Sequence, residues 1–285
     1  MKLTVALVFC SLLAGGCAQR VVSEPPKEAA KPTISKHSTV PKTNTAKLET
    51  KDPYWLRAEE EIYRSPEELA AQDDREKRRG QVLPKLSRGN PNEKVLALTF
   101  DDGPHPIYTQ KLLDILKAED VKATFFVIGK MVEKHPELLK AIYAGGHEVG
   151  NHTFSHVTLT KIPEEDILTE YRANNDIVQK TIGLKMVVCR PPGGDYDAQV
   201  IQTATACGLT TVLWTDDPGD YANPGTNVVA ERTMARLSNG GIILLHDGIQ
   251  QTLDVLPQII AYAKGKGFRF VTASELGKTL KGTQK

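Results

Sequence analysis

From residue 93 onward, short apolar runs of β-type residues alternate with longer stretches of helical periodicity. The expected strands are 95–100, 123–128, 147–150, 186–190, 210–214, 241–245 and 269–271. The expected helices between them are 108–119, 136–144, 164–182, 198–206, 227–237 and 253–264. Strands that alternate with helices form parallel sheets. The pattern therefore predicts an α/β barrel and excludes an antiparallel sandwich.

Two adjacent carboxylates follow the first expected strand. That strand runs into Asp101 and Asp102, and Gly103-Pro104 then ends it as a turn would. Neighbouring carboxylates repel and raise each other's cost of ionisation, so a fold rarely pairs them for stability. A bound cation would remove that cost for one carboxylate and leave the other free as a base.

Two histidines follow the third expected strand, about fifty residues later. His152 and His156 are separated by four positions, and on a helical turn this spacing places both rings on one face. A carboxylate with two histidines leaves coordination positions open, which is typical of a metal that takes part in catalysis. Each pair alone is common on protein surfaces, but their occurrence together indicates a site.

Three further polar motifs end or follow later strands. They are RPPGG at 190–194, DPGDY at 217–221 and LLH at 244–246. Every candidate residue thus lies at the carboxyl end of an expected strand, which is where barrel enzymes build their active sites.

These five motifs, in this order, resemble those of the NodB-homology polysaccharide deacetylases, carbohydrate esterase family 4. Among these proteins, the chain is most similar to bacterial peptidoglycan N-acetylglucosamine deacetylases. The resemblance covers residues 93–281 and implies an irregular (β/α)7 barrel, in agreement with the strand count. The chain is therefore expected to be an α/β barrel with an N-terminal helical and flexible extension.

The resemblance also implies a ligand set for a divalent cation. Asp102, His152 and His156 would hold the ion, with Zn²⁺ as the first choice and Co²⁺, Ni²⁺ or Mn²⁺ as alternatives. Asp101 would be the catalytic base. Arg190 would keep Asp101 ionised and correctly oriented.

The remaining roles implied by the resemblance concern the leaving group and the substrate. His246 would be the general acid, with Asp220 holding it charged and oriented. The backbone amide of Gly193 would bind the oxyanion, at a position where the family commonly has an aromatic residue. Tyr221 would form an aromatic wall in place of the family's frequent Trp, and Leu244 would line the pocket for the acetyl methyl group.

Together these features predict a metal-dependent hydrolase that removes N-acetyl groups from N-acetylglucosamine in peptidoglycan. Family members that act on N-acetylmuramic acid commonly lack the second Asp of the first motif, and Asp102 is present here. Chitin oligomers, exopolysaccharide and acetylated xylan remain alternative substrates. An inactive wall-glycan-binding module is an alternative of another class, as is a non-haem Fe(II) oxygenase with the same ligand types.

The first residues indicate export. Lys2, the apolar segment 3–13 and Ala14-Gly15-Gly16-Cys17 resemble a signal peptide (1–17) that ends in a bacterial lipobox. We expect acylation of Cys17 and a membrane-anchored lipoprotein, with ordinary cleavage and a periplasmic or extracellular location as the alternative. Residues 18–52 are rich in Pro, Lys, Thr and Ser and predict a flexible tether.

The rest of the chain before the barrel is a charged segment, 53–92, with a helical pattern. Ser65-Pro66 is typical of a helix start. The whole chain has 36 basic and 35 acidic residues, so it has no large excess of positive charge that would favour binding to nucleic acid. We expect a monomer whose partner is a polysaccharide, and we expect Cys189 and Cys207 to be free thiols because they lie at opposite ends of one strand–helix unit.

Overall fold

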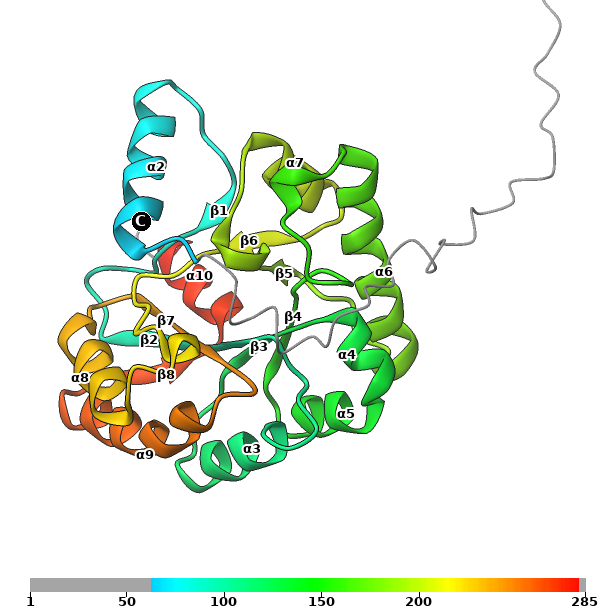
Figure 1. Ribbon diagram of the computed structural model, residues 1–285. Coiled ribbons are helices and arrows are strands. Elements are labelled where there is room, and N and C mark those ends of the chain that lie inside the picture. Colours follow the sequence, from blue (N-terminus) through cyan, green and yellow to red (C-terminus); the bar gives the residue numbers. More distant parts are fainter. Residues whose placement is uncertain (1–62, 282–285) are drawn as a thin grey trace, which may run out of the picture. The chain divides into compact units, whose positions relative to one another are not determined.

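The computed structural model describes residues 63–281 (Figure 1). The predicted signal peptide with Cys17, the predicted tether and the start of the extension lie outside the described residues. Within 63–281, no helix combines the length and the apolar character needed to cross a membrane.

All strand pairs in the described residues are parallel. The sheet has eight strands there, in the order β1-β6-β5-β4-β3-β2-β7, with β8 also paired to β2. The strands are β1 Lys85–Leu86, β2 Val95–Asp101, β3 Thr124–Val127, β4 Glu148–Asn151, β5 Val188–Cys189, β6 Thr210–Val212, β7 Gly241–His246 and β8 Arg269–Val271. A bridge between Asp216 and Ile243 joins the segment after β6 to β7 and closes the curled sheet. The seven expected strands correspond to β2–β8, and the predicted α/β barrel is confirmed.

Helices surround this sheet on its outer side (Figure 1). They are α3 Thr109–Ala118, α4 Gly129–Lys134, α5 Pro136–Ala144, α6 Glu164–Ile182, α7 Ala198–Ala206, α8 Thr226–Arg236, α9 Gln250–Gly265 and α10 Ala273–Lys281. Six of them match the expected helices, whereas α4 and α10 were not predicted. Every residue of β2 and β7 is buried, as expected for parallel strands covered on both faces. These two strands carry the first and last motifs.

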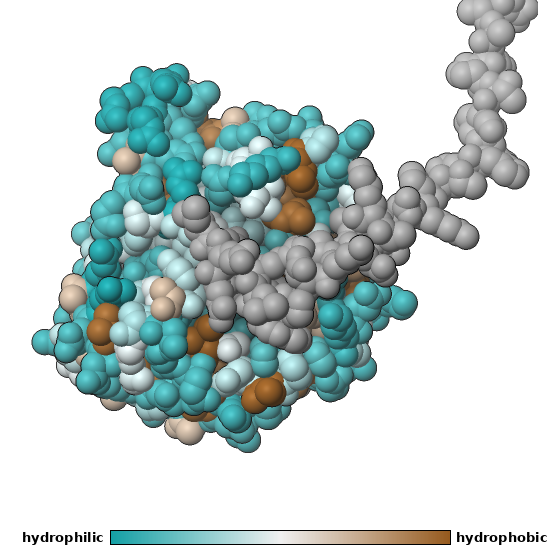
Figure 2. Space-filling view, in the orientation of Figure 1, coloured by the Kyte–Doolittle hydropathy of each residue, from teal (hydrophilic) through white to brown (hydrophobic). Residues whose placement is uncertain are grey.

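The extension contributes a helix, α2 Pro66–Arg78, which begins at the expected position. The Ser65 hydroxyl accepts a hydrogen bond from the Glu68 backbone N–H at 3.2 Å, and the Glu68 carboxylate accepts one from the Ser65 N–H at 2.8 Å. This reciprocal pair is a capping box. Leu69 of α2 is buried in the core, whereas the outer surface of the helix, at the upper left of Figure 2, is hydrophilic.

The extension also supplies a strand, which the sequence analysis did not predict. Lys85 and Leu86 form β1 and pair with β6. The Lys85 ammonium lies 2.7 Å from the Asp73 carboxylate and 2.6 Å from that of Glu76, which ties α2 to the barrel. A strand of two residues has no periodicity that a sequence pattern can reveal, and its pairing with β6 is what defines it.

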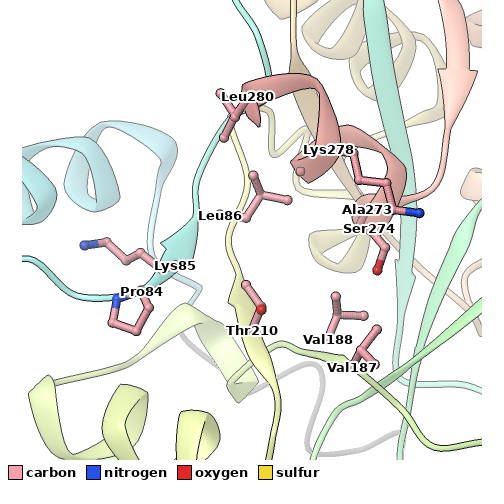
Figure 3. A pocket seen from close by; sticks show the side chains of 11 residues that line it. Pro84, Lys85, Leu86, Val187, Val188, Thr210, Ala273, Ser274, Lys278 and Leu280 are labelled. Carbon is pink, nitrogen blue, oxygen red and sulfur yellow. The ribbon is translucent and has the colours of Figure 1, made fainter. Parts of the chain in front are cut away.

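A pocket of about 410 Å³ lies at the end of the barrel where β5 and β6 begin (Figure 3). Its lining combines α10 with β1 and the first residues of β5 and β6, and it is mostly apolar. Cys189 and Cys207 are both free, as predicted.

Candidate functional site

The opposite end of the barrel gathers the polar residues of the five motifs. Asp101 is the last residue of β2 and His246 the last of β7, and the two are direct partners in the parallel register. Arg190 follows β5 and His152 follows β4, which are neighbouring strands. Because the carboxyl ends of parallel strands meet at one edge, residues up to 145 positions apart converge there.

Asp102, His152 and His156 form a compact, buried group. Oδ1 of Asp102 lies 3.3 Å from Nε2 of His152 and 3.1 Å from Nε2 of His156. One potential ligand atom from each residue lies within 4.8 Å of the others. The structure therefore brings together the three residues for which the family resemblance implies metal binding.

The backbone around the two histidines differs from the expected helical turn. Thr153 has φ 63° and His156 has φ 59°, both in the left-handed region, so residues 152–156 form a loop. Side chains distant in the sequence hold this loop: the Glu170 carboxylate accepts the backbone N–H groups of Phe154 and Ser155, each at 2.8 Å. Asn151 accepts the Thr153 N–H, also at 2.8 Å. These contacts favour the loop over the helix that the spacing alone suggested.

The atoms that face each other in this group fit a cation. Nδ1 of His152 lies 2.8 Å from the Arg190 carbonyl oxygen, which only accepts, so Nδ1 carries a proton. In the neutral ring, Nε2 then presents a lone pair toward Asp102 Oδ1, and both atoms are buried with no hydrogen-bond partner among the described residues. A cation between them would turn this repulsion into attraction.

The electrostatic environment of Asp102 leads to the same conclusion. Burial by itself raises the pKa of this carboxyl, but the charge of His156 and the close approach of both imidazoles outweigh it and hold the pKa well below its usual range. Asp102 also has φ 78°, an unusual value for a non-glycine residue that the surrounding structure imposes. The site thus holds the Asp102 carboxylate in its charged form, close to the imidazoles of His152 and His156.

Arg190 forms a buried ion pair with Asp101. Its guanidinium donates to Asp101 Oδ1 at 2.7 Å and to the Thr99 hydroxyl at 2.8 Å. The ring centroids of Phe126 and Trp214 lie 4.2 and 5.4 Å from the guanidinium carbon, so two aromatic rings help to stabilise the charge. Burial lowers the pKa of Arg190, and Asp101 opposes that shift. One oxygen of Asp101 is thereby fixed, and the other, Oδ2, faces the histidines.

His246 is held by Asp220. Nδ1 of His246 lies 2.7 Å from Asp220 Oδ1, and the His246 backbone N–H donates to Asp220 Oδ2 at 2.8 Å. The Thr252 hydroxyl completes the environment of this carboxylate at 2.5 Å. Burial alone would lower the pKa of His246, but Asp220 outweighs it and raises the pKa to about 10. His246 Nε2 has no hydrogen-bond partner within the described part of the chain.

The three expected substrate contacts also lie at this end. Gly193 has φ 63° in the short turn Pro192–Gly194 after β5. The Tyr221 ring lies 5.2 Å from the His246 ring, at 80° to it. Leu244 is buried on β7, two residues before His246, so both side chains point to the same side of the strand.

Several supporting residues were missed by sequence reasoning. They are Thr99, Phe126, Glu170, Trp214 and Thr252, together with Tyr63 of the extension, whose ring packs 4.9 Å from that of His246. None of these residues has a motif of its own, and each acts through a partner distant in the sequence.

A parallel barrel with a carboxylate and two histidines at its carboxyl ends defines a class of potential metal-binding hydrolases. The family model "Polysaccharide deacetylase" matches residues 88–212. A peptidoglycan N-acetylglucosamine deacetylase of Bacillus cereus is 40% identical over 190 residues, covering 65% of this chain and 89% of that protein. This chain therefore belongs to the NodB-homology (CE4) polysaccharide deacetylase family.

Two other relatives have different named substrates. A peptidoglycan N-acetylmuramic acid deacetylase of Bacillus subtilis is 36% identical, and the match covers 70% of this chain and 42% of that longer protein. A chitooligosaccharide deacetylase of Sinorhizobium fredii is 34% identical, covering 66% of this chain and 92% of that protein.

Solved structures share the fold. A peptidoglycan N-acetylglucosamine deacetylase matches with a TM-score of 0.67 and 34% identity, over 69% of this chain and 94% of that one. A protein described as a CE4 family pseudoenzyme from Bacillus anthracis matches with a TM-score of 0.66 and 29% identity, over 69% and 70%. The family fold is thus found both in deacetylases and in a pseudoenzyme.

Proposed function

We propose that this protein is a metal-dependent N-deacetylase that hydrolyses the acetamide of N-acetylglucosamine residues in peptidoglycan. One observation supports this most strongly: the Asp102–His152–His156 group lies at the same edge of the barrel as a carboxylate fixed by Arg190 and an imidazole fixed by Asp220. Amide hydrolysis needs such a base and such an acid on either side of the reacting carbonyl.

Asp102, His152 and His156 would hold a divalent cation, which supplies polarisation of the acetamide carbonyl and a lowered pKa for water. Asp101 is the base in this proposal. Its Oδ1 is bound by Arg190, and its Oδ2 lies 3.8 Å from His152 Nε2 without a hydrogen-bond partner among the described residues. Oδ2 is therefore the atom available to remove the proton of the attacking water.

His246 then protonates the leaving amine. A sugar amide anion is a very poor leaving group, so the nitrogen must receive a proton as the C–N bond breaks. Asp220 keeps Nδ1 engaged and favours the charged imidazole, which leaves the Nε2 proton for transfer. The backbone amide of Gly193 would donate to the oxygen on which negative charge develops.

The choice of substrate rests on the sequence and on the relatives. Asp102 is present, and the relative with the highest identity reported above is named for N-acetylglucosamine in peptidoglycan. The chitooligosaccharide deacetylase supports the same sugar in another polymer. Peptidoglycan and chitooligosaccharides have the N-acetylglucosamine unit in common.

The family's pseudoenzyme makes an inactive wall-binding module the second candidate. Against it, the base, the acid and their two positioning partners are all present and paired here. Acetate release from purified peptidoglycan, chitin oligomers and acetylated xylan, measured with the Zn²⁺-loaded protein, tests the proposal. Release of acetate from peptidoglycan should exceed release from xylan. Glycan binding without any release of acetate would instead indicate that the protein is an inactive wall-binding module.

We further propose that the protein is exported and anchored through an acylated Cys17, on the basis of the lipobox-like sequence. Mature lipoproteins carry several acyl chains, and two or more chains give stable membrane attachment. The wild type should sediment with membranes, and Cys17→Ser should be released or remain unprocessed. A soluble protein with Ala18 at its free N-terminus would contradict this proposal.

A further inference from the structure

Two adjacent residues of the extension reach into the candidate site, although they precede the family match at residue 88. Tyr63 and Arg64 lie just before the cap of α2. They contact three residues of the proposed machinery: Gly193, Tyr221 and His246. The contacts of Tyr63 and Arg64 therefore indicate a role in that site.

The ring contacts of Tyr63 are close. Its ring centroid lies 4.1 Å from that of Tyr221, with the planes at 31°, and 4.9 Å from that of His246, with the planes at 74°. Tyr63 itself is only 7% exposed. At this separation Tyr63 and Tyr221 are packed against each other, and a sugar ring cannot lie between them.

The acid and the metal-binding group are closed to solvent in this arrangement. His246 is 1% exposed and Asp102 is 2% exposed. Within the described residues, the rings that pack on His246 are those of Tyr63 and Tyr221. A glycan must bring its acetamide nitrogen within hydrogen-bond distance of His246, so whatever covers the imidazole must first move.

Arg64 is held by polar contacts that are partly exposed to solvent. The Arg64 backbone N–H donates to the Gly193 carbonyl at 2.9 Å, and its guanidinium pairs with Asp195 at 3.1 Å and donates to the Gln72 side chain of α2 at 3.0 Å. By contrast, α2 is fixed by the burial of Leu69 and by the double ion pair of Lys85. The burial of Leu69 and the ion pairs of Lys85 involve neither Tyr63 nor Arg64, so α2 would stay in place if those two residues moved.

We propose that Tyr63 and Arg64 form a strap that covers the active site and competes with the glycan. This inference rests on the proposed function, since it assigns the covered groups to substrate. In the closed form, Tyr63 shields His246, and a glycan binds only after the strap is displaced. The apparent affinity for glycan is then reduced by the fraction of molecules that are open.

The test measures binding of the N-acetylglucosamine tetramer by calorimetry, in Zn²⁺-loaded full-length protein carrying Asp101→Asn to prevent turnover. Adding Tyr63→Ala should lower the Kd about tenfold, as expected if about a tenth of the molecules are open. Arg64→Ala, which removes the Asp195 ion pair and the hydrogen bond to Gln72, should lower the Kd about threefold. Tyr63→Phe should bind like the parent because it keeps the ring.

Arg236→Ala is the matched control. It removes a 2.7 Å ion pair with Glu67 that also ties the extension to the barrel but does not involve the strap. The Kd should stay within about twofold of the parent. An equal gain in this variant would mean that general loosening of α2 is responsible and would overturn the strap.

A second readout does not depend on glycan. The rate at which a chelating dye captures Zn²⁺ from the site should rise several-fold in Tyr63→Ala and not in Arg236→Ala. If Tyr63→Ala weakens tetramer binding, Tyr63 contacts the substrate and the strap proposal is wrong. The proposal is also wrong if neither the tetramer affinity nor the rate of metal release changes. Failure of the proposed function is distinct, because then neither the wild type nor Tyr63→Ala, each with Asp101 intact, releases acetate.

Discussion

The two ends of the barrel bury their polar groups in opposite ways. At the carboxyl ends of the strands, His246 lies against Asp220 and its pKa is raised to about 10. At the amino ends, His147 precedes β4, accepts the Ala123 N–H at 3.2 Å and has a pKa lowered to about 4 by burial and by Lys122. Both imidazoles are buried, yet one is kept charged and the other neutral.

The difference shows where the fold tolerates the unfavourable free energy of burying a charged group. Burying a charge is unfavourable unless it is paired, and the carboxyl end contains two such pairs together with a carboxylate–histidine group. The other end has a mostly apolar pocket, a histidine in a hydrogen bond to the backbone, and the Lys85 ion pairs that tie α2 to the barrel. We therefore expect changes at the carboxyl end to alter activity and changes at the amino end to alter stability.

The largest effect is expected from removal of the metal. Treatment with a strong chelator should lower deacetylation by about 10³-fold, equivalent to about 4 kcal/mol of transition-state stabilisation, and Zn²⁺ should restore it. His152→Ala should bind less metal, whereas Asp101→Asn should keep its metal and lose turnover. Elemental analysis of the metal content, together with activity assays, distinguishes the two variants. Full activity in metal-free protein would refute the assignment of Asp102, His152 and His156 as ligands of a catalytic metal.

The next effect is expected from His246→Ala. Loss of the general acid should cost about 10²–10⁴ in rate on the amide substrate. The loss should be much smaller on an activated acetate ester, because its leaving group needs little protonation. Measured kcat values on both substrates test this, and equal losses would mean that His246 is not the acid.

Asp220→Asn should change the pH dependence. The acid must be protonated, so the rate falls as pH rises through the pKa of His246, which Asp220 holds above the ordinary value of about 6.5. Without the carboxylate, burial lowers that pKa, and the alkaline limb should move to lower pH, with an overall loss of about 10- to 100-fold at pH 8. A pH–rate profile of kcat/KM measures the shift. If the alkaline limb does not move, the pKa that it reports belongs to a group other than His246.

The smallest effect on activity is expected at the amino end. Leu86→Ala removes a buried side chain of β1 and should destabilise the protein by about 2–5 kcal/mol in denaturant unfolding. The activity per folded molecule should stay within about twofold, because Leu86 lies at the opposite end from the site. A large fall in kcat at full folding would show that the two ends are coupled and would break the comparison.

The secondary structure was readable where elements are long. Helix α6 matches its expected bounds, and β2 and β7 differ from theirs by one residue, because their periodicity and apolar runs extend over several positions. The two-residue strand β1, the six-residue helix α4 and the nine-residue helix α10 were not predicted. Their formation depends on neighbours supplied by the rest of the fold.

The sequence by itself determined the barrel and placed the motif residues at one edge, because strand order and strand ends follow from alternation along the chain. Only the tertiary structure decided how those residues meet. The loop at 152–156 replaces a helical turn because Glu170, on α6, accepts its N–H groups, and Tyr63, far from His246 in the sequence, packs against its ring. Interactions between residues far apart in the chain leave no local pattern, so they become visible only when the chain is folded.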